Sequence, residues 1–96
     1  MAGLDDIIHQ STRLRIMTAL NVLQVNDSIE FVRLKALTEA SDGNLGAHLD
    51  TLARAGYVTL EKQFVGKKPQ TRIHATAQGR AAYQAHVMEL RRLLSI

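Results

Sequence analysis

The sequence has no cysteine and no tryptophan, one proline, and only two phenylalanines and two tyrosines. The lack of cysteine excludes disulfide bridges, thiolate metal sites and cysteine nucleophiles. No apolar run approaches the roughly 20 residues that cross a bilayer, and the N-terminal Met-Ala-Gly-Leu-Asp-Asp is acidic where a signal peptide is basic. These absences predict a cytoplasmic protein without a thiol-based metal or redox sensor.

The length and the charge distribution indicate the number of domains and the kind of partner. A chain of 96 residues predicts one domain, residues 1–96, with a core of limited size. The net charge is +3, but residues 1–50 carry four basic and seven acidic side chains, whereas residues 51–96 carry eight basic and two acidic ones. A phosphate-facing surface is therefore expected in the second half.

A capped amphipathic helix is predicted from Ser41. The Ser41 hydroxyl suits an N-cap, and an acidic residue follows it at the positive end of the helix dipole. Leu45, Leu49 and Leu52 recur at i, i+4 and i+7, which places them on one buried face. Gly56 ends the helix, because glycine readily takes the left-handed conformation that closes one.

The spacing changes to period two after this glycine. Val58, Leu60 and Phe64 alternate with polar residues, and a second alternating run covers residues 71–76. Gly66-Lys67-Lys68-Pro69 between them predicts a basic turn. A helix with small polar residues followed at once by a basic hairpin is the layout of a winged-helix nucleic-acid binder.

Five segments in order carry a resemblance to a family. They are FVRLKAL (31–37), SDGNLGAHL (41–49), AGYV (55–58), GKKPQT (66–71) and TAQGR (76–80). Together they resemble small winged-helix transcriptional regulators of the MarR and ArsR groups, from about Leu4 to Leu94. The resemblance implies an α+β, mostly helical fold, with a helix-turn-helix at about 32–55, a hairpin wing at about 57–75 and a C-terminal helix at about 77–94. It also implies that residues 28–31 pair with the hairpin as a third strand.

The remaining helices follow from capping and periodicity. Ser11 is expected to cap a helix over 12–23, and a second helix over 32–40 is expected to point Leu34 and Leu37 inward. Thr76 is expected to cap the last helix, whose apolar seam is longer than so small a domain needs. We therefore expect a homodimer whose interface uses Leu4, Ile7, Ile8, Tyr83, Val87, Leu90 and Leu94.

The candidate recognition residues for DNA lie at the start of the helix from Ser41. They are Ser41, Asp42, Gly43, Asn44, Ala47 and His48. Asparagine can read adenine with two hydrogen bonds, and glycine lets the backbone approach the bases. The alternatives are that Asn44 only assists the cap and that His48 packs on the hairpin. Gly46 and Ala47 stand where related regulators often carry longer polar side chains, which favours sparse base readout and recognition of DNA shape.

The candidate wing patch comprises Lys62, Gln63, Lys67, Lys68, Gln70 and Arg72. Basic side chains on a hairpin neutralise phosphates and make affinity salt-dependent, although a charged hairpin is also an ordinary solvated edge. Arg13 is expected either to contact the DNA backbone or to pair with Asp5 or Asp6.

No cofactor, metal site or enzyme activity is expected. His86 and Glu89 stand at i, i+3, but two ligands per chain are few for zinc, and we expect a surface histidine beside a surface acid. No nucleophile and base pair or phosphate loop is present. The sequence thus favours a homodimeric, sequence-specific regulator on a pseudo-palindromic duplex, with a small-molecule effector left open. The alternative is a winged helix that binds proteins and not specific DNA.

Overall fold

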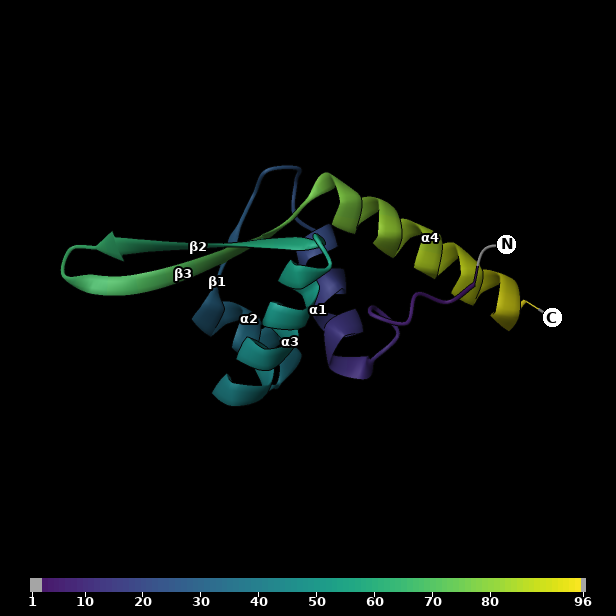
Figure 1. The fold of residues 1–96 in the computed structure, drawn as a ribbon, viewed down its shortest axis with the longest axis horizontal. Helices are drawn as coiled ribbons and strands as arrows, with labels where there is room; N and C mark the ends of the chain where they lie inside the picture. The colour runs from purple at the N-terminus through teal and green to yellow at the C-terminus, as the bar shows by residue number, and fades with distance from the viewer. Residues whose placement is uncertain (1–2, 96) are drawn as a thin grey trace.

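The computed structural model describes residues 3–95. Its elements are, in order, α1 (Ser11–Asn21), β1 (Ile29–Glu30), α2 (Phe31–Thr38), α3 (Asp42–Arg54), β2 (Val58–Val65), β3 (Lys68–Ala75) and α4 (Ala77–Leu94). Helices α1 to α3 gather on one side of a small sheet, while the β2–β3 hairpin and α4 project in opposite directions (Figure 1). These projections make the molecule elongated, with extents of 53 × 25 × 21 Å. The predicted winged-helix fold is confirmed.

The sheet has three antiparallel strands in the order β1-β3-β2. Ile29 lies opposite Ile73, so the predicted third strand is confirmed. Val65 lies opposite Lys68, which leaves a two-residue loop of Gly66 and Lys67. Gly66 has a φ of 65°, which glycine adopts without the steric cost that other residues meet. The turn is therefore shorter than predicted, and Lys68 and Pro69 belong to β3.

The core lies between the sheet and helices α1 to α3. The predicted leucine face of α3 is confirmed, since Leu45, Leu49 and Leu52 are buried. Their partners include residues from α1, α2 and all three strands: Ile16, Met17, Leu20, Ile29, Leu34, Val58, Ile73 and Ala75. The core ends where the hairpin leaves the helices, and Leu60 and Phe64 farther along β2 are exposed.

Two details of the first helices differ from the prediction. Helix α1 begins at Ser11 and not after it, because the side chain of Gln10 is the cap and accepts from the backbone N–H of Arg13 at 2.9 Å. Leu37, expected in the core, is 54% exposed. It lies in the last turn of a helix of only eight residues, whose core contact is made by Leu34.

An N-terminal segment is fastened to α4, beside which it runs in Figure 1. The backbone N–H of Asp5 donates to Nδ1 of His86, and the hydroxyl of Tyr57 donates to Oδ2 of Asp5 at 2.7 Å. His86 is 1% exposed and Glu89 is 8% exposed. The expectation of a surface histidine beside a surface acid was therefore wrong: His86 holds the N-terminal segment, and Glu89 pairs with Arg92.

The end of α3 and the start of α4 are joined through one threonine. The Thr76 side chain caps α4, as predicted, by accepting from the N–H of Gly79 at 2.9 Å, and it donates to the carbonyl of Gly56 at 2.6 Å. Gly79 is packed so closely that an added Cβ would lie 2.0 Å from the carbonyl oxygen of Tyr57. The end of α3 and the first turn of α4 are therefore closely packed.

No helix within residues 3–95 is long and apolar enough to cross a membrane.

Candidate nucleic-acid interface

Helix α3 presents a face of very small side chains to solvent. Its start is fixed by Ser41, whose hydroxyl accepts from the N–H of Asn44 at 3.2 Å, as predicted. With Leu45, Leu49 and Leu52 turned inward, Gly43 and Ala47 fall on the opposite side of the helix and are exposed.

The two glycines of α3, Gly43 and Gly46, have no role in internal packing. A Cβ added to Gly43 or to Gly46 would meet no atom within 4 Å. Glycine inside an exposed helix is nevertheless about 1 kcal/mol less favourable than alanine. Packing inside the chain therefore does not explain the two glycines, which leave part of the helix backbone exposed.

Two other predicted recognition residues differ in whether their side chains already have partners within the chain. Within the described chain, the side-chain amide of the exposed Asn44 makes no hydrogen bond, so it is available to a partner. Asp42 is paired with Lys35 of α2 at 2.8 Å. Its carboxylate is thereby partly neutralised where a nucleic acid would approach.

His48 is held by α1 and not by the hairpin, contrary to the alternative considered above. Its Nδ1 lies 3.1 Å from Nη1 of Arg13, whose Nε donates to the carbonyl of Ile7. Burial, and then the positive charge of Arg13, lower the pKa of His48, so the ring is neutral and accepts at Nδ1. Arg13 thus serves this contact and does not pair with Asp5 or Asp6.

The β2–β3 hairpin, called the wing below, has two distinct faces. The strand register places Lys62 opposite Thr71 and Phe64 opposite Pro69, on the face that begins with the buried Val58. The opposite face carries Gln63, Val65, Lys68, Gln70 and Arg72, and Gln63 donates to Gln70 across the strands at 2.8 Å.

Arg72 differs from the other predicted wing residues because it already has partners. Its Nε donates to the hydroxyl of Ser28 and its Nη2 to the carbonyl of Ser28, both at 2.8 Å. These bonds fasten the segment before β1 to the central strand. The structure therefore gives Arg72 an internal role, and its contact with DNA stays a prediction.

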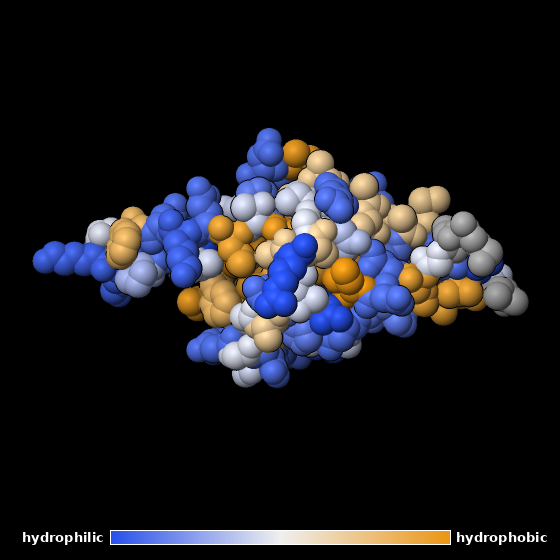
Figure 2. Space-filling model, viewed as in Figure 1, coloured by the Kyte–Doolittle hydropathy of each residue, from blue (hydrophilic) through white to orange (hydrophobic). Residues whose placement is uncertain are grey.

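The wing lysines are exposed and free of ion pairs in the described residues. Ion pairs there join Arg15 to Glu39, Lys35 to Asp42, Arg54 to Asp50 and Arg92 to Glu89. Lys62, Lys67 and Lys68 are left to interact with a partner. Figure 2 shows hydrophilic residues over most of the wing, with a small apolar patch near its tip. Phe64 and Val65, which lie on opposite faces of the wing, are both exposed in this region.

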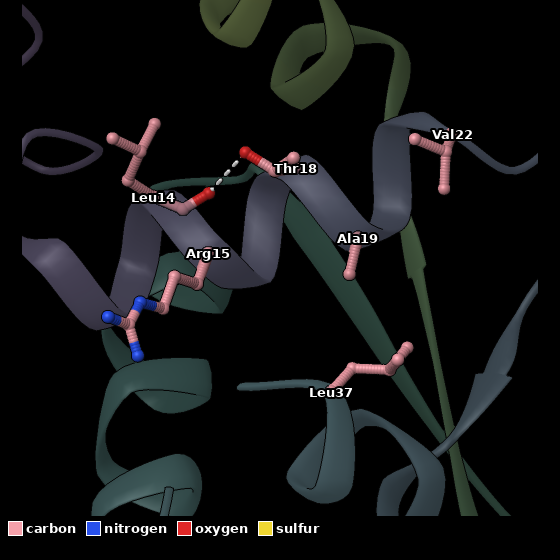
Figure 3. A pocket seen from close by; sticks show the side chains of 6 residues that line it. All are labelled: Leu14, Arg15, Thr18, Ala19, Val22 and Leu37. Atoms are coloured by element: carbon pink, nitrogen blue, oxygen red, sulfur yellow. Dashed lines mark hydrogen bonds between the residues drawn. The ribbon is translucent and has the colours of Figure 1, made fainter. Parts of the chain in front are cut away.

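A groove between α1 and α2 was not found by sequence reasoning. It measures about 460 Å³ and is lined by Leu14, Arg15, Thr18, Ala19, Val22 and Leu37, as Figure 3 shows. Thr18 uses its hydroxyl to bind the carbonyl of Leu14, so the groove is largely apolar. The groove was not predicted because Leu37, which lines it, was expected in the core.

The predicted interface residues fall into three groups. Leu4, Ile7, Tyr83, Val87 and Leu90 are half-buried, Leu94 is 82% exposed, and Ile8 is fully buried in the core. Ile8 offers no surface to a second chain, because packing inside this chain already covers it. Met88, 68% exposed, adds apolar surface on α4 that the prediction missed.

The described residues contain no group of three or more histidine, cysteine or acidic side chains arranged to hold a metal ion. His86 and Glu89 therefore lack a third such ligand in this part of the chain.

Comparison with known proteins agrees with this geometry. The family described as winged helix DNA-binding domain matches residues 12–94. An uncharacterized protein of Methanocaldococcus jannaschii is 31% identical over 87 residues, which cover 91% of each chain.

Solved structures share the fold. A transcriptional regulator homologue from Pyrococcus horikoshii superposes with a TM-score of 0.82 at 24% identity, over 93% of this chain and 85% of that one. NadR in complex with 4-hydroxyphenylacetate gives 0.71 at 22% identity, over 93% and 63%. A MarR-family transcriptional regulator from Silicibacter pomeroyi gives 0.64 at 24% identity, over 90% and 60%.

Proposed function

Because this chain belongs to the winged helix DNA-binding domain family, we propose that it is a homodimeric transcriptional regulator that binds a specific DNA operator. The observation that carries the proposal is the exposed glycine face of α3, which internal packing does not explain, beside a wing whose lysines have no ion-pair partner in the described residues. A close approach by a polyanion explains both features.

In this proposal α3 enters the major groove. Gly43 and Ala47 bring its backbone close to the base edges, and the free amide of Asn44 is the side chain suited to pair with adenine. Lys62, Lys67 and Lys68 contact phosphates, which position the protein whatever the sequence. Direct readout is sparse, so the shape and deformability of the duplex supply part of the specificity.

A homodimer is the second part of this proposal. The half-buried seam of Tyr83, Val87 and Leu90, extended by the exposed Leu94, leaves apolar surface on α4 for a second copy. Two-fold symmetry then predicts a pseudo-palindromic operator with half-sites about one helical turn apart or slightly more.

A small-molecule effector is part of the proposal. NadR, which shares the fold, holds 4-hydroxyphenylacetate. The groove between α1 and α2 gives a small apolar effector a volume of about 460 Å³ here. Such an effector acts by stabilising one relative orientation of the two reading heads.

A second candidate function is protein binding without specific DNA recognition. The same apolar groove favours it, together with the exposed Val22 and Leu37 on its rim. Free wing lysines do not follow from this alternative, which is why we rank it second.

The test is a titration of a fluorescent random duplex at two salt concentrations, after the solution mass is measured in the same sample. We expect a dimer whose affinity falls steeply with salt, and Lys67→Ala should reduce the salt slope by about 1.8, because each of the two protomers loses one phosphate contact. Arg91→Ala, which removes the same charge from exposed α4, is the matched control.

Two results would count against the proposal. Equal slopes for Lys67→Ala, Arg91→Ala and the unmodified protein would remove the wing from the interface. A protein that ignores duplex DNA at low salt would give the protein-binding alternative the lead.

A further inference from the structure

The tip of the wing exposes an aromatic side chain that the function above does not use. Phe64 is 75% exposed, whereas Phe31, the other phenylalanine, packs partly buried against the core. A large apolar side chain on the edge of a two-stranded ribbon invites association with other molecules. Its position calls for a partner.

The surroundings of Phe64 indicate an anionic partner. Pro69 lies opposite it, so the ring and the pyrrolidine form one apolar edge on the face of the wing that carries Lys62. The loop with Lys67 follows two residues after Phe64, and Lys68 precedes Pro69. Lys62 shares the face of Phe64, Lys67 lies in the turn and Lys68 on the opposite face, and none of the three has an ion-pair partner in the described residues. An apolar wedge on so basic a hairpin complements a groove between phosphates.

Among anionic partners, duplex DNA fits best, because Phe64 lies on the same side of the sheet as α3. Phe64 lies on the face that begins with the buried Val58 and Ile73, and this is the side of the sheet that the helices cover. A duplex held by α3 therefore meets this side of the wing, where its next groove passes the hairpin.

We propose that Phe64, supported by Pro69, is an apolar wedge that enters the minor groove beside the segment held by α3. It packs against deoxyribose and partly unstacks one base step, as inserted apolar side chains do in minor-groove binders. This inference rests on the proposed function and deepens it. The wedge favours pyrimidine–purine steps, which deform easily, and thereby supplies specificity at positions that α3 does not touch.

The test compares Phe64→Ser with Val65→Ser, the neighbouring apolar residue on the other face of the wing, which is 57% exposed. The probe is a fluorescent duplex with TA steps at regular spacing, with donor and acceptor dyes at its ends to report bending. We expect Phe64→Ser to weaken binding roughly five- to a hundredfold, the range for loss of one stacking aromatic, and to abolish the bend. The salt slope should stay unchanged, because no phosphate contact is lost.

Controls separate the wedge from folding defects. Circular dichroism checks that each variant folds, Val65→Ser should bind within twofold of the unmodified protein, and Phe64→Leu should restore binding because the wedge remains apolar. Equal losses for the Ser variants at positions 64 and 65 would overturn the assignment to Phe64.

Three further outcomes keep the two proposals distinguishable. Binding of Phe64→Ser within twofold and with the same bend would overturn the wedge and leave the regulator proposal intact. Failure of the unmodified protein to bind DNA at low salt would overturn both. Loss of binding to phosphatidylserine vesicles in Phe64→Ser, with DNA binding unchanged, would assign the side chain to a membrane surface and overturn the wedge.

Discussion

The backbone N–H of Asp5 donates a hydrogen bond to Nδ1 of His86, 81 residues later in the chain, at 3.1 Å. This contact requires an unprotonated Nδ1, so the ring is neutral and carries its proton on Nε2, which is buried without a partner in the described residues. Burial lowers the pKa of His86, the nearby His9 lowers it further, and the opposing effect of Asp5 does not restore it. Protonating His86 therefore works against the attachment of the N-terminal segment.

Folding stability should consequently fall as the pH is lowered below about 6.5, the ordinary pKa of histidine. The unfolded chain then binds a proton that the folded chain refuses, until the pH passes the lowered pKa of folded His86. The contribution approaches about 1.4 kcal/mol per pH unit in that window. Urea unfolding at a series of pH values should show a flatter profile for His86→Leu.

His48→Leu is the control for this experiment, since the pKa of His48 is lowered separately by burial and Arg13. Each variant should flatten the dependence of unfolding free energy on pH, and the two reductions should add in the double variant, because the two histidines titrate independently. Parallel profiles for His86→Leu and the unmodified protein would contradict the proposed role of His86.

Gly79→Ala should destabilise the fold, although alanine normally favours a helix. The added Cβ would lie 2.0 Å from the carbonyl oxygen of Tyr57, which is backbone and has little freedom to move. We expect a loss of about 1–3 kcal/mol, as for other overpacked sites. Thermal unfolding measures this, and a raised Tm would show that the junction has slack.

Gly46→Ala should have the opposite effect on stability and an adverse effect on DNA binding. Its Cβ points into open space, so the helix gains about 1 kcal/mol. The same methyl group stands between the α3 backbone and a duplex, so affinity should fall. A raised Tm with unchanged affinity would remove Gly46 from the contact surface, and Gly79→Ala provides the opposing stability control.

Leu94→Glu should produce monomers while leaving the fold intact. Leu94 is 82% exposed, so the substitution removes little internal packing, whereas a carboxylate in an apolar helix seam disfavours association. Light scattering across a concentration series measures the effect. Ala81→Glu, on an exposed position of the same helix outside the seam, is the control, and a persisting dimer in Leu94→Glu would place the interface elsewhere.

Features with a local cause could be predicted from the sequence. The caps at Ser41 and Thr76, the leucine face of α3 and the alternation in β2 and β3 depend on neighbours within a few residues. The pairing of β1 needed the family resemblance, because two residues carry no pattern of their own.

Features that join distant segments could not be predicted. Nothing near His86 indicates that its partner is Asp5, and nothing near Arg72 indicates Ser28. Leu37 fitted the helical spacing of the core, but its exposure depends on where α1 and α2 separate. Of the candidate site, the sequence predicted the wing lysines and the small residues of α3, which are exposed in the structure, and their contact with DNA stays a prediction. Phe64 was treated only as one position in an alternating strand.

The junction at Thr76 connects the helix proposed to read DNA, α3, with the helix proposed to form the dimer, α4. Since Thr76 bonds both to Gly56, just after α3, and to the first turn of α4, it couples the position of α3 to that of α4. In the proposed homodimer, a slip of one helical turn along the α4 contact, about 5.4 Å, would change the distance between the two α3 helices by a similar amount, about one and a half base-pair steps. The register of the α4 contact between protomers would then determine the spacing of the operator half-sites.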